Sequence, residues 1–266
     1  MRVPARAAVP TALLAATLVL PPVIPGPGAT VAAGAGSVTT ASGHRGSDAV
    51  VERRKLGESV RGRPIMAYRL GERTGPVVVL FSTMHGNEPR PRQILLSLRD
   101  RRPVRGVDLW VVPTYNPDGL AAGTRRNAHG VDLNRNFPYR WADLDGSYES
   151  GPRPRSEPET RAVIRFLRDV RPRRILSFHQ PLHGVDQDTK NRRFARRVAR
   201  TLQLPRKTFD CGGVCHGTMT GWYNDRFRGS ALTVEYGPDP GRRLMRRTAP
   251  RRVLDLFGAH RVRVRR

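Results

Sequence analysis

Residues 77–88 read VVVLFSTMHGNE, an unbroken apolar run that ends in polar side chains. The run follows the turn signal Gly75-Pro76, and its form is typical of a strand that is buried on both faces. Similar runs span 107–112, 174–179 and 231–236, and helical patterns lie among them. This alternation predicts an α/β domain with a largely parallel sheet that helices cover on both faces.

The segments among these strands have the polar and apolar spacing of surface helices. Ser156 is expected to cap one of them, with Glu157 and Glu159 in its first turn, where negative charge suits the helix dipole. Residues 116–119 read NPDG, a strong turn signal, and 120–157 form a long polar stretch of the kind that is usually functional. The predicted helices are 91–98, 156–170, 191–202 and 251–260.

Candidate catalytic residues follow three of the predicted strands. His85 and Glu88 come after the first, His179 ends the middle one and Glu235 ends the last. Because a parallel sheet brings these ends to one edge, two imidazoles and a carboxylate can supply three zinc ligands and leave a fourth position for water. A second carboxylate is then free to take a proton from that water.

Each of these signals is weak when it is taken alone. A His at the end of a strand is often a hydrogen-bonded structural residue, and Glu235 can equally pair with one of the many arginines. Their joint placement at strand ends favours the metal site.

The polar stretch adds a second set of candidates. Residues 130–137 read GVDLNRNF and present the Asn134 amide beside the Arg135 guanidinium. A guanidinium matches a carboxylate with two hydrogen bonds, so this pair suits the free end of a chain. Arg125 can stabilise an oxyanion at an attacked carbonyl. The alternative is a solvated loop with surface arginines.

The first residues have the order of a secretory signal peptide: positive charge, a short apolar run and then small residues. We assign 1–36 to such a signal, 37–57 to a linker or N-terminal extension, and 58–266 to one catalytic domain. An uncleaved membrane anchor is the alternative. We therefore expect a secreted monomer, extracellular or associated with the cell wall, without a transmembrane span after cleavage.

The cysteines and the charge bear on the surroundings of the protein. Cys211 and Cys215 predict a disulfide that pins a loop, with a two-thiolate metal site as the weaker reading. The chain has 48 basic and 22 acidic residues, a net charge of +26, and all but three of the basic residues are arginine. Such a field favours anionic wall polymers or membrane head groups, although compositional bias towards arginine also explains it. No basic stripe interleaved with aromatics supports a nucleic-acid partner.

Together these motifs resemble the zinc carboxypeptidase family over about residues 58–240. The resemblance rests on His85 to Glu88, the NPDG turn, 130–137, His179 and Thr233-Val234-Glu235. It implies a three-layer α/β/α fold with a mixed, largely parallel sheet of about eight strands.

The resemblance also implies roles for individual residues. One Zn²⁺ per chain would be held by His85, Glu88 and His179, with Glu235 as the general base. Arg125 would polarise the scissile carbonyl. The terminal carboxylate of a peptide substrate would be held by Asn134 and Arg135.

Within the family, the chain is most similar to bacterial murein peptide amidases. The shared stretches are 127–138, 156–160 and 177–179. This likeness implies cleavage between γ-D-glutamate and a diamino acid in wall peptides. The alternatives are a general carboxypeptidase on L-peptides and a wall-binding protein with a decayed site, although all four central residues are intact.

The chain departs from the family pattern in two places. Gly213 falls where digestive members carry a mobile Tyr, so we assign no such role. The specificity-pocket position is Thr220, which is neither acidic nor large and apolar. That argues against a strict preference for Lys or Arg, and against a bulky apolar terminal residue.

Overall fold

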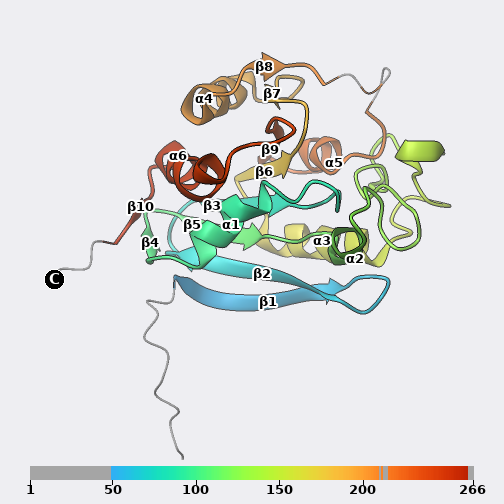
Figure 1. The fold of residues 1–266 in the computed structure, drawn as a ribbon, viewed down its shortest axis with the longest axis horizontal. Helices are drawn as coiled ribbons and strands as arrows, with labels where there is room; N and C mark the ends of the chain where they lie inside the picture. The colour runs from blue at the N-terminus through green and yellow to red at the C-terminus, as the bar shows by residue number, and fades with distance from the viewer. Residues whose placement is uncertain (1–48, 210, 212–214, 263–266) are drawn as a thin grey trace, which may run out of the picture. The chain divides into compact units, whose positions relative to one another are not determined.

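Eight strands form one mixed sheet in the part of the chain that the computed structural model describes, residues 49–209, 211 and 215–262 (Figure 1). The four strands β5, β3, β6 and β9 lie side by side and run parallel, whereas β1, β2 and β7 join by antiparallel pairing. In sheet order the strands are β1 (Val50–Glu58), β2 (Pro64–Gly71), β5 (Asp108–Val112), β3 (Val77–Ser82), β6 (Arg174–His179), β9 (Ser230–Glu235), β7 (Gly184–Asp186) and β8 (Arg206–Lys207).

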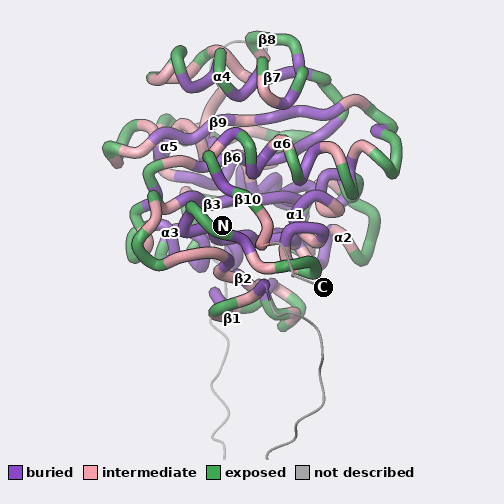
Figure 2. Tube along the Cα trace, turned by 90° about the vertical axis from the view of Figure 1, so that its left-hand side faces the viewer, coloured by how far each residue is buried: buried purple, intermediate pink, exposed green. Residues whose placement is uncertain are grey.

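Helices cover both faces of this sheet. Side chains alternate along each central strand, so Val78 and Leu80 of β3 face one core, while Val79 and Phe81 face the other. The first core lies under α1 (Arg92–Arg99), α4 (Arg192–Leu202), the π-helical turn η2 (Leu244–Thr248) and α6 (Ala249–Leu256); the second lies under α3 (Pro158–Val170) and α5 (Met219–Arg226). Figure 2 shows the buried strands between helices with exposed outer faces. The predicted three-layer α/β/α fold with a mixed sheet is confirmed.

Smaller elements complete the described chain. A two-stranded sheet pairs β4 (Val104–Arg105) with β10 (His260–Arg261). The long connection after β5 contains α2 (Pro117–Ala122) and the 3-10 turn η1 (Gly146–Tyr148).

Strand register brings the functional residues to one edge of the sheet. His179 of β6 lies directly beside Glu235 of β9, and Ser82 of β3 lies beside Phe178. His85 is three residues beyond the end of β3, so it rises from the same edge. The parallel strands therefore bring His85, His179 and Glu235 to one edge of the sheet, as the sequence pattern predicts.

Several boundaries differ from those predicted. Residues 50–57, which we assigned to a linker or extension, form most of β1, so the folded domain begins before residue 58. The closing helix, predicted over 251–260, is α6 and ends at Leu256, and His260 pairs in β10. The predicted signal segment and residues 37–48 lie outside the described residues.

Two local signals act differently from our expectation. Ser156 does not cap α3. Its hydroxyl donates a hydrogen bond to the Glu157 carboxylate and accepts one from the Asn136 side-chain amide instead. The NPDG turn opens a short helix, α2, in which the Asn116 side chain accepts from Gly119 N at 2.8 Å and a proline takes the first position. Asn and Pro favour helix starts as well as turns.

Among the described residues, no helix combines the length and the apolar character that a membrane span requires.

Candidate active site

Three buried side chains converge beyond the carboxyl ends of β3 and β6. The distance from His85 Nδ1 to Glu88 Oε1 is 2.7 Å, and that from His179 Nδ1 to Glu88 Oε2 is 2.9 Å. The two Nδ1 atoms are 3.3 Å apart. One atom from each residue thus points at a common centre, with all three atoms within 4.8 Å of one another.

Partners on the far side of each imidazole fix its orientation. His85 Nε2 lies 3.0 Å from Asp132 Oδ1, and His179 Nε2 lies 2.8 Å from the Ser177 hydroxyl. Because a carboxylate only accepts, His85 Nε2 carries a proton and can donate it to Asp132. A carboxylate behind the ring is the outer-shell arrangement usual for metal-binding histidines. Nδ1 can bind a metal once the proton that it shares with Glu88 is released.

The loop that carries His85 fits against α2 with almost no room. A Cβ atom on Gly86 would lie 1.9 Å from the backbone carbon of Gly119. The Asn116 amide also donates to Met84 O at 3.3 Å. This close packing of the NPDG segment holds the loop at the edge of the sheet.

Charge is concentrated in this buried group. Burial lowers the pKa of His85, but the Asp132 and Glu88 carboxylates more than offset this and raise it to about 9. Burial raises the pKa of Glu88, but His85 and His179 together lower it to about 2. His85 is therefore protonated at neutral pH in the absence of metal, and a metal that binds Nδ1 must displace the Nδ1 proton.

Asp132 links this group to the neighbouring loop. Its side chain is completely buried, and its Oδ1 also accepts from the backbone N of Asn134 at 2.8 Å. Its Oδ2 accepts from Arg125 Nε at 3.0 Å and Nη2 at 2.8 Å. Burial alone would raise the pKa of Asp132, yet His85 and Arg125 hold it well below its usual range. One carboxylate thus orients three candidate residues.

Asn134 and Arg135 lie in the wall of the adjoining cleft. Asn134 Oδ1 accepts from the backbone N of Met219 at 3.1 Å, so its amide N–H groups remain as donors. The Arg135 guanidinium lies 4.7 Å from the Tyr148 ring centroid and donates to Asn134 O at 2.8 Å. Burial lowers the pKa of Arg135, with Asp132 opposing that effect.

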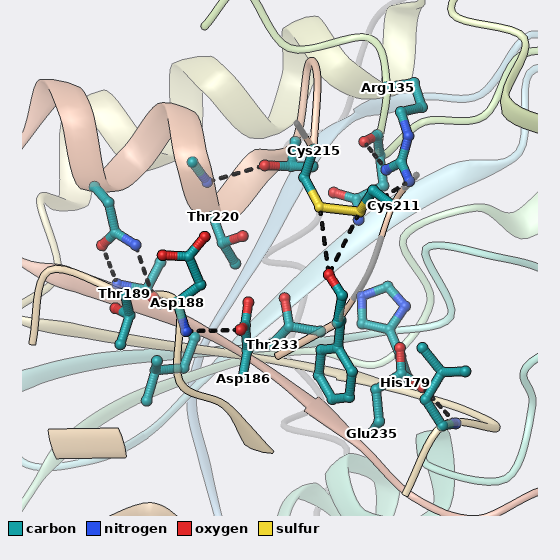
Figure 3. A pocket seen from close by; sticks show the side chains of 18 of the residues that line it. Arg135, His179, Asp186, Asp188, Thr189, Cys211, Cys215, Thr220, Thr233 and Glu235 are labelled. Carbon is teal, nitrogen blue, oxygen red and sulfur yellow. Dashed lines mark hydrogen bonds between the residues drawn. A yellow bond between two sulfur atoms is a disulfide. The ribbon is translucent and has the colours of Figure 1, made fainter. Parts of the chain in front are cut away.

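The cleft has a volume of about 1160 Å³ and joins the His-Glu-His group to this wall. Thr220 and Glu235 line it as well, so the structure brings together all eight predicted site residues. Figure 3 shows four of them, namely Arg135, His179, Thr220 and Glu235. Cys211 and Cys215 form a disulfide at its rim, as predicted, and Arg135 Nη2 lies 3.7 Å from Cys211 Sγ. The sulfurs are bonded to each other, which excludes the two-thiolate metal site.

Glu235 faces the cleft without a cationic partner. It is 7% exposed, and its Oε2 accepts from the backbone N of Leu182 at 3.3 Å. It forms no ion pair with a basic residue in the described part of the chain, so the suggested arginine pairing is not realised. Burial raises its pKa, with the neighbouring charges having smaller and opposing effects.

The sequence profile of the zinc carboxypeptidase family matches residues 45–187 of this chain. The chain belongs to the zinc carboxypeptidase family. It is therefore a zinc metallopeptidase of the α/β carboxypeptidase fold, as the sequence motifs predict.

Among its relatives are bacterial murein peptide amidases. The chain is 29% identical over 204 residues to murein peptide amidase A of Escherichia coli K12, covering 68% of this chain and 80% of the relative. The corresponding protein of Vibrio campbellii is 30% identical over 196 residues, covering 68% and 78%.

Solved structures agree on the fold. The murein-tripeptide amidase of Escherichia coli O157 superposes with a TM-score of 0.62 at 27% identity, covering 78% of this chain and 92% of that structure. The carboxypeptidase A of Helicoverpa armigera gives a TM-score of 0.65 at 16% identity, covering 79% and 68%. The latter likeness concerns the fold alone.

The zinc carboxypeptidase family uses a metal that the residues present here fit. Two imidazole nitrogens and a carboxylate oxygen converge, one imidazole is held by a carboxylate, and a cleft opens beside them. That set matches the three protein ligands of a catalytic zinc site with one position left open.

Asp132 is a functional residue that sequence reasoning missed. It lies within the quoted 130–137 stretch, two residues before Asn134, but we gave it no role. The signal that could have identified it is the frequent pairing of a metal-binding His with a carboxylate in the outer shell.

We predict that Asp132→Asn weakens zinc binding by about ten- to a hundredfold. The amide cannot supply the negative charge that holds His85 and Arg125. Zinc affinity would be measured by competition with a chromophoric chelator, with the exposed Asp143→Asn of the same loop as the matched control. Equal affinities for Asp132→Asn, the control and the wild type would contradict the role of this carboxylate.

Proposed function

We propose that the protein is an exported carboxypeptidase that hydrolyses the bond between γ-D-glutamate and a terminal diamino acid in cell-wall peptides. The observation that carries this proposal is a single cleft lined by the His-Glu-His group, the Asn134–Arg135 pair and Glu235, which has no cationic partner among the described residues. The pattern of residues 1–36 supports export.

The cleft can hold a substrate by its end. Arg135 would bind the terminal carboxylate with two hydrogen bonds, and Asn134 would add an amide donor. This places the last amide bond near the His-Glu-His group and excludes substrates whose terminus is blocked. Arg125, fixed by Asp132, would donate to the carbonyl oxygen as negative charge develops on it.

Glu235 would move the proton. Its carboxylate would take a proton from the attacking water and return it to the leaving amine. A zinc ion held by His85, Glu88 and His179 would supply the Lewis acidity that lowers the pKa of water and polarises the carbonyl. Glu235 suits this part because it is buried, faces the cleft and has no cation to keep it from accepting a proton.

Two observations favour wall peptides over ordinary L-peptides as the substrate. The similarity to murein peptide amidases covers about two thirds of this chain. The neutral Thr220 does not provide a pocket for bulky apolar residues. A non-catalytic wall-binding role is disfavoured because every central residue is present and assembled.

We predict that L-Ala-γ-D-Glu-diaminopimelate is cleaved with release of the diamino acid, and that a chelator abolishes the reaction. Glu235→Gln should lower kcat by about a hundred- to ten-thousandfold, because the amide cannot accept the proton. Turnover would be measured by amine release, with the exposed Glu58→Gln on β1 as the matched control.

The results separate the alternatives. Turnover only of L-dipeptides that are blocked at the amino end and free at the carboxyl end would keep the mechanism and overturn the wall substrate. Unchanged turnover by Glu235→Gln would overturn the assignment of the base.

A second feature suggests what holds the protein at the wall. Helix α4 carries five arginines and no acidic residue, and residues 242–252, across η2 and into α6, carry six more. None of these eleven forms an ion pair with a carboxylate of the described residues. The two segments are packed together, since Arg197 donates to Leu256 O and Phe194 contacts Phe257.

We propose that this arginine face, α4 with residues 242–252, binds an anionic phosphate polymer of the cell wall. Closely spaced guanidinium groups that no carboxylate neutralises attract such polymers and match their phosphates in pairs of hydrogen bonds. The face begins at the amino end of α4, two residues after the cleft-lining Lys190. Binding there would hold the cleft close to wall peptides.

We predict that Gln at Arg192, Arg193, Arg196 and Arg200 weakens co-sedimentation with purified walls by about tenfold at moderate salt. The control replaces four exposed arginines on or near α3, namely Arg153, Arg155, Arg165 and Arg168. Walls from which the phosphate polymer has been removed should retain neither the wild type nor the control variant. Equal loss in both variants would show that net charge alone acts, and would overturn the assigned face.

A further inference from the structure

Gln180 is a buried amide that has no part in the mechanism above. It follows His179 directly at the end of β6, and it is 7% exposed. Burial of an amide costs free energy unless its oxygen and its nitrogen are both hydrogen-bonded. Gln180 meets this requirement with partners in two other loops, and both of these loops carry residues of the active site.

The Gln180 side chain joins the loop after β3 to the loop after β9. Its Oε1 accepts from the backbone N of Arg90 at 3.0 Å, and its Nε2 donates to Pro238 O at 2.8 Å. Arg90 is two residues beyond Glu88. Pro238 is three residues beyond Glu235. The orientation of the amide is fixed, because a backbone N–H only donates and a carbonyl oxygen only accepts.

The strand order explains what this bridge adds. β6 lies between β3 and β9, which do not pair with each other (Figure 1). The parallel ladders align the three strands only as far as Ser82, His179 and Glu235. The loops beyond these residues continue outside the ladders. Gln180 reaches across the end of β6 and ties both loops to the middle strand.

The same two loops also meet at the surface. Arg90 Nη2 pairs with Asp239 Oδ1 at 2.9 Å, but the two side chains are 52% and 78% exposed. Exposed ion pairs stabilise a structure little, because water and salt screen them. The buried amide is therefore the stronger constraint. In addition, the backbone N of Gln180 donates to Glu88 Oε2 at 3.4 Å.

We propose that Gln180 is a positioning residue that fixes the Glu235 carboxylate relative to the His-Glu-His group. The proposal rests on the function proposed above, in which Glu235 takes a proton from the attacking water. Proton transfer requires hydrogen-bond reach, and a displacement of about 1 Å can lower a rate by about a hundredfold. Gln180 acts through the two loops, since the amide is already occupied by their backbone groups.

Gln180→Met tests this role, because Met keeps the length of the side chain and loses both hydrogen bonds. We expect kcat to fall by about ten- to a hundredfold. KM should change by less than about threefold, because Asn134 and Arg135 are untouched. Gln93→Met is the matched control, because that side chain accepts from Arg246 Nε at 2.8 Å and lies on α1, outside the cleft lining. It should keep the kcat of the wild type.

A double-mutant cycle with Glu235→Gln separates positioning from general support of the fold. Once the base is removed, its position no longer matters. Adding Gln180→Met to Glu235→Gln should therefore lower kcat by no more than about twofold. A further loss of about tenfold or more in the double variant, or an unchanged kcat in Gln180→Met alone, would overturn the proposal.

Two further measurements separate this proposal from the proposed function. The cycle would be run on the wall tripeptide and on amino-blocked L-dipeptides, so cleavage of the dipeptides alone rejects the wall bond and still tests Gln180. If neither is cut, crystal structures of the zinc-loaded wild type and Gln180→Met decide. The Glu235 carboxylate should move by about 1 Å or more relative to Glu88, with zinc affinity kept within about threefold. Identical positions in the two structures would overturn the proposal.

Discussion

The buried Asp132 carboxylate is the contact on which the rest of the site depends. It accepts from His85, Arg125 and the backbone of Asn134, and it is completely enclosed. A buried charge is stable only when it is paired and hydrogen-bonded. Loss of His85 or Arg125 would leave the negative charge of Asp132 less compensated in the interior. Because Asp132 lies in the long loop after β5 and His85 follows β3, their contact joins the two segments. The His-Glu-His group and the cleft wall that contains Asn134 and Arg135 are thereby held as one unit.

The same principle explains how a strongly basic chain keeps an acidic centre. Most carboxylates in the first two thirds of the described chain have an arginine or histidine partner, as Asp108 has Arg69 and Asp118 has Arg63. Three carboxylates of the cleft, Glu235, Asp186 and Asp188, form no ion pair with a described residue. Their free oxygens face the space that a substrate would occupy. The unpaired groups therefore mark the places where chemistry or recognition is expected.

Elements buried on both faces could be predicted from the sequence, and edge elements could not. β3 and β6 occur at the predicted residues, because continuous apolar runs fit little else in an α/β domain. β1 was missed because it is an edge strand rich in charged residues, and its pairing with β2 and packing against α3 form only in the fold. The three-residue β7 is too short to leave a pattern.

The candidate site divides in a similar way. His85, Glu88, His179 and Glu235 follow recognisable strands, so topology alone brings them together. The part played by Asp132 depends on which atoms its side chain contacts, and the packing of the long loop decides that. The most direct test is anomalous diffraction from crystals grown with zinc. The account predicts one zinc ion bound by His85 Nδ1, Glu88 and His179 Nδ1, with Asp132 still on His85 Nε2. Zinc bound through Nε2, or at another place, would contradict it.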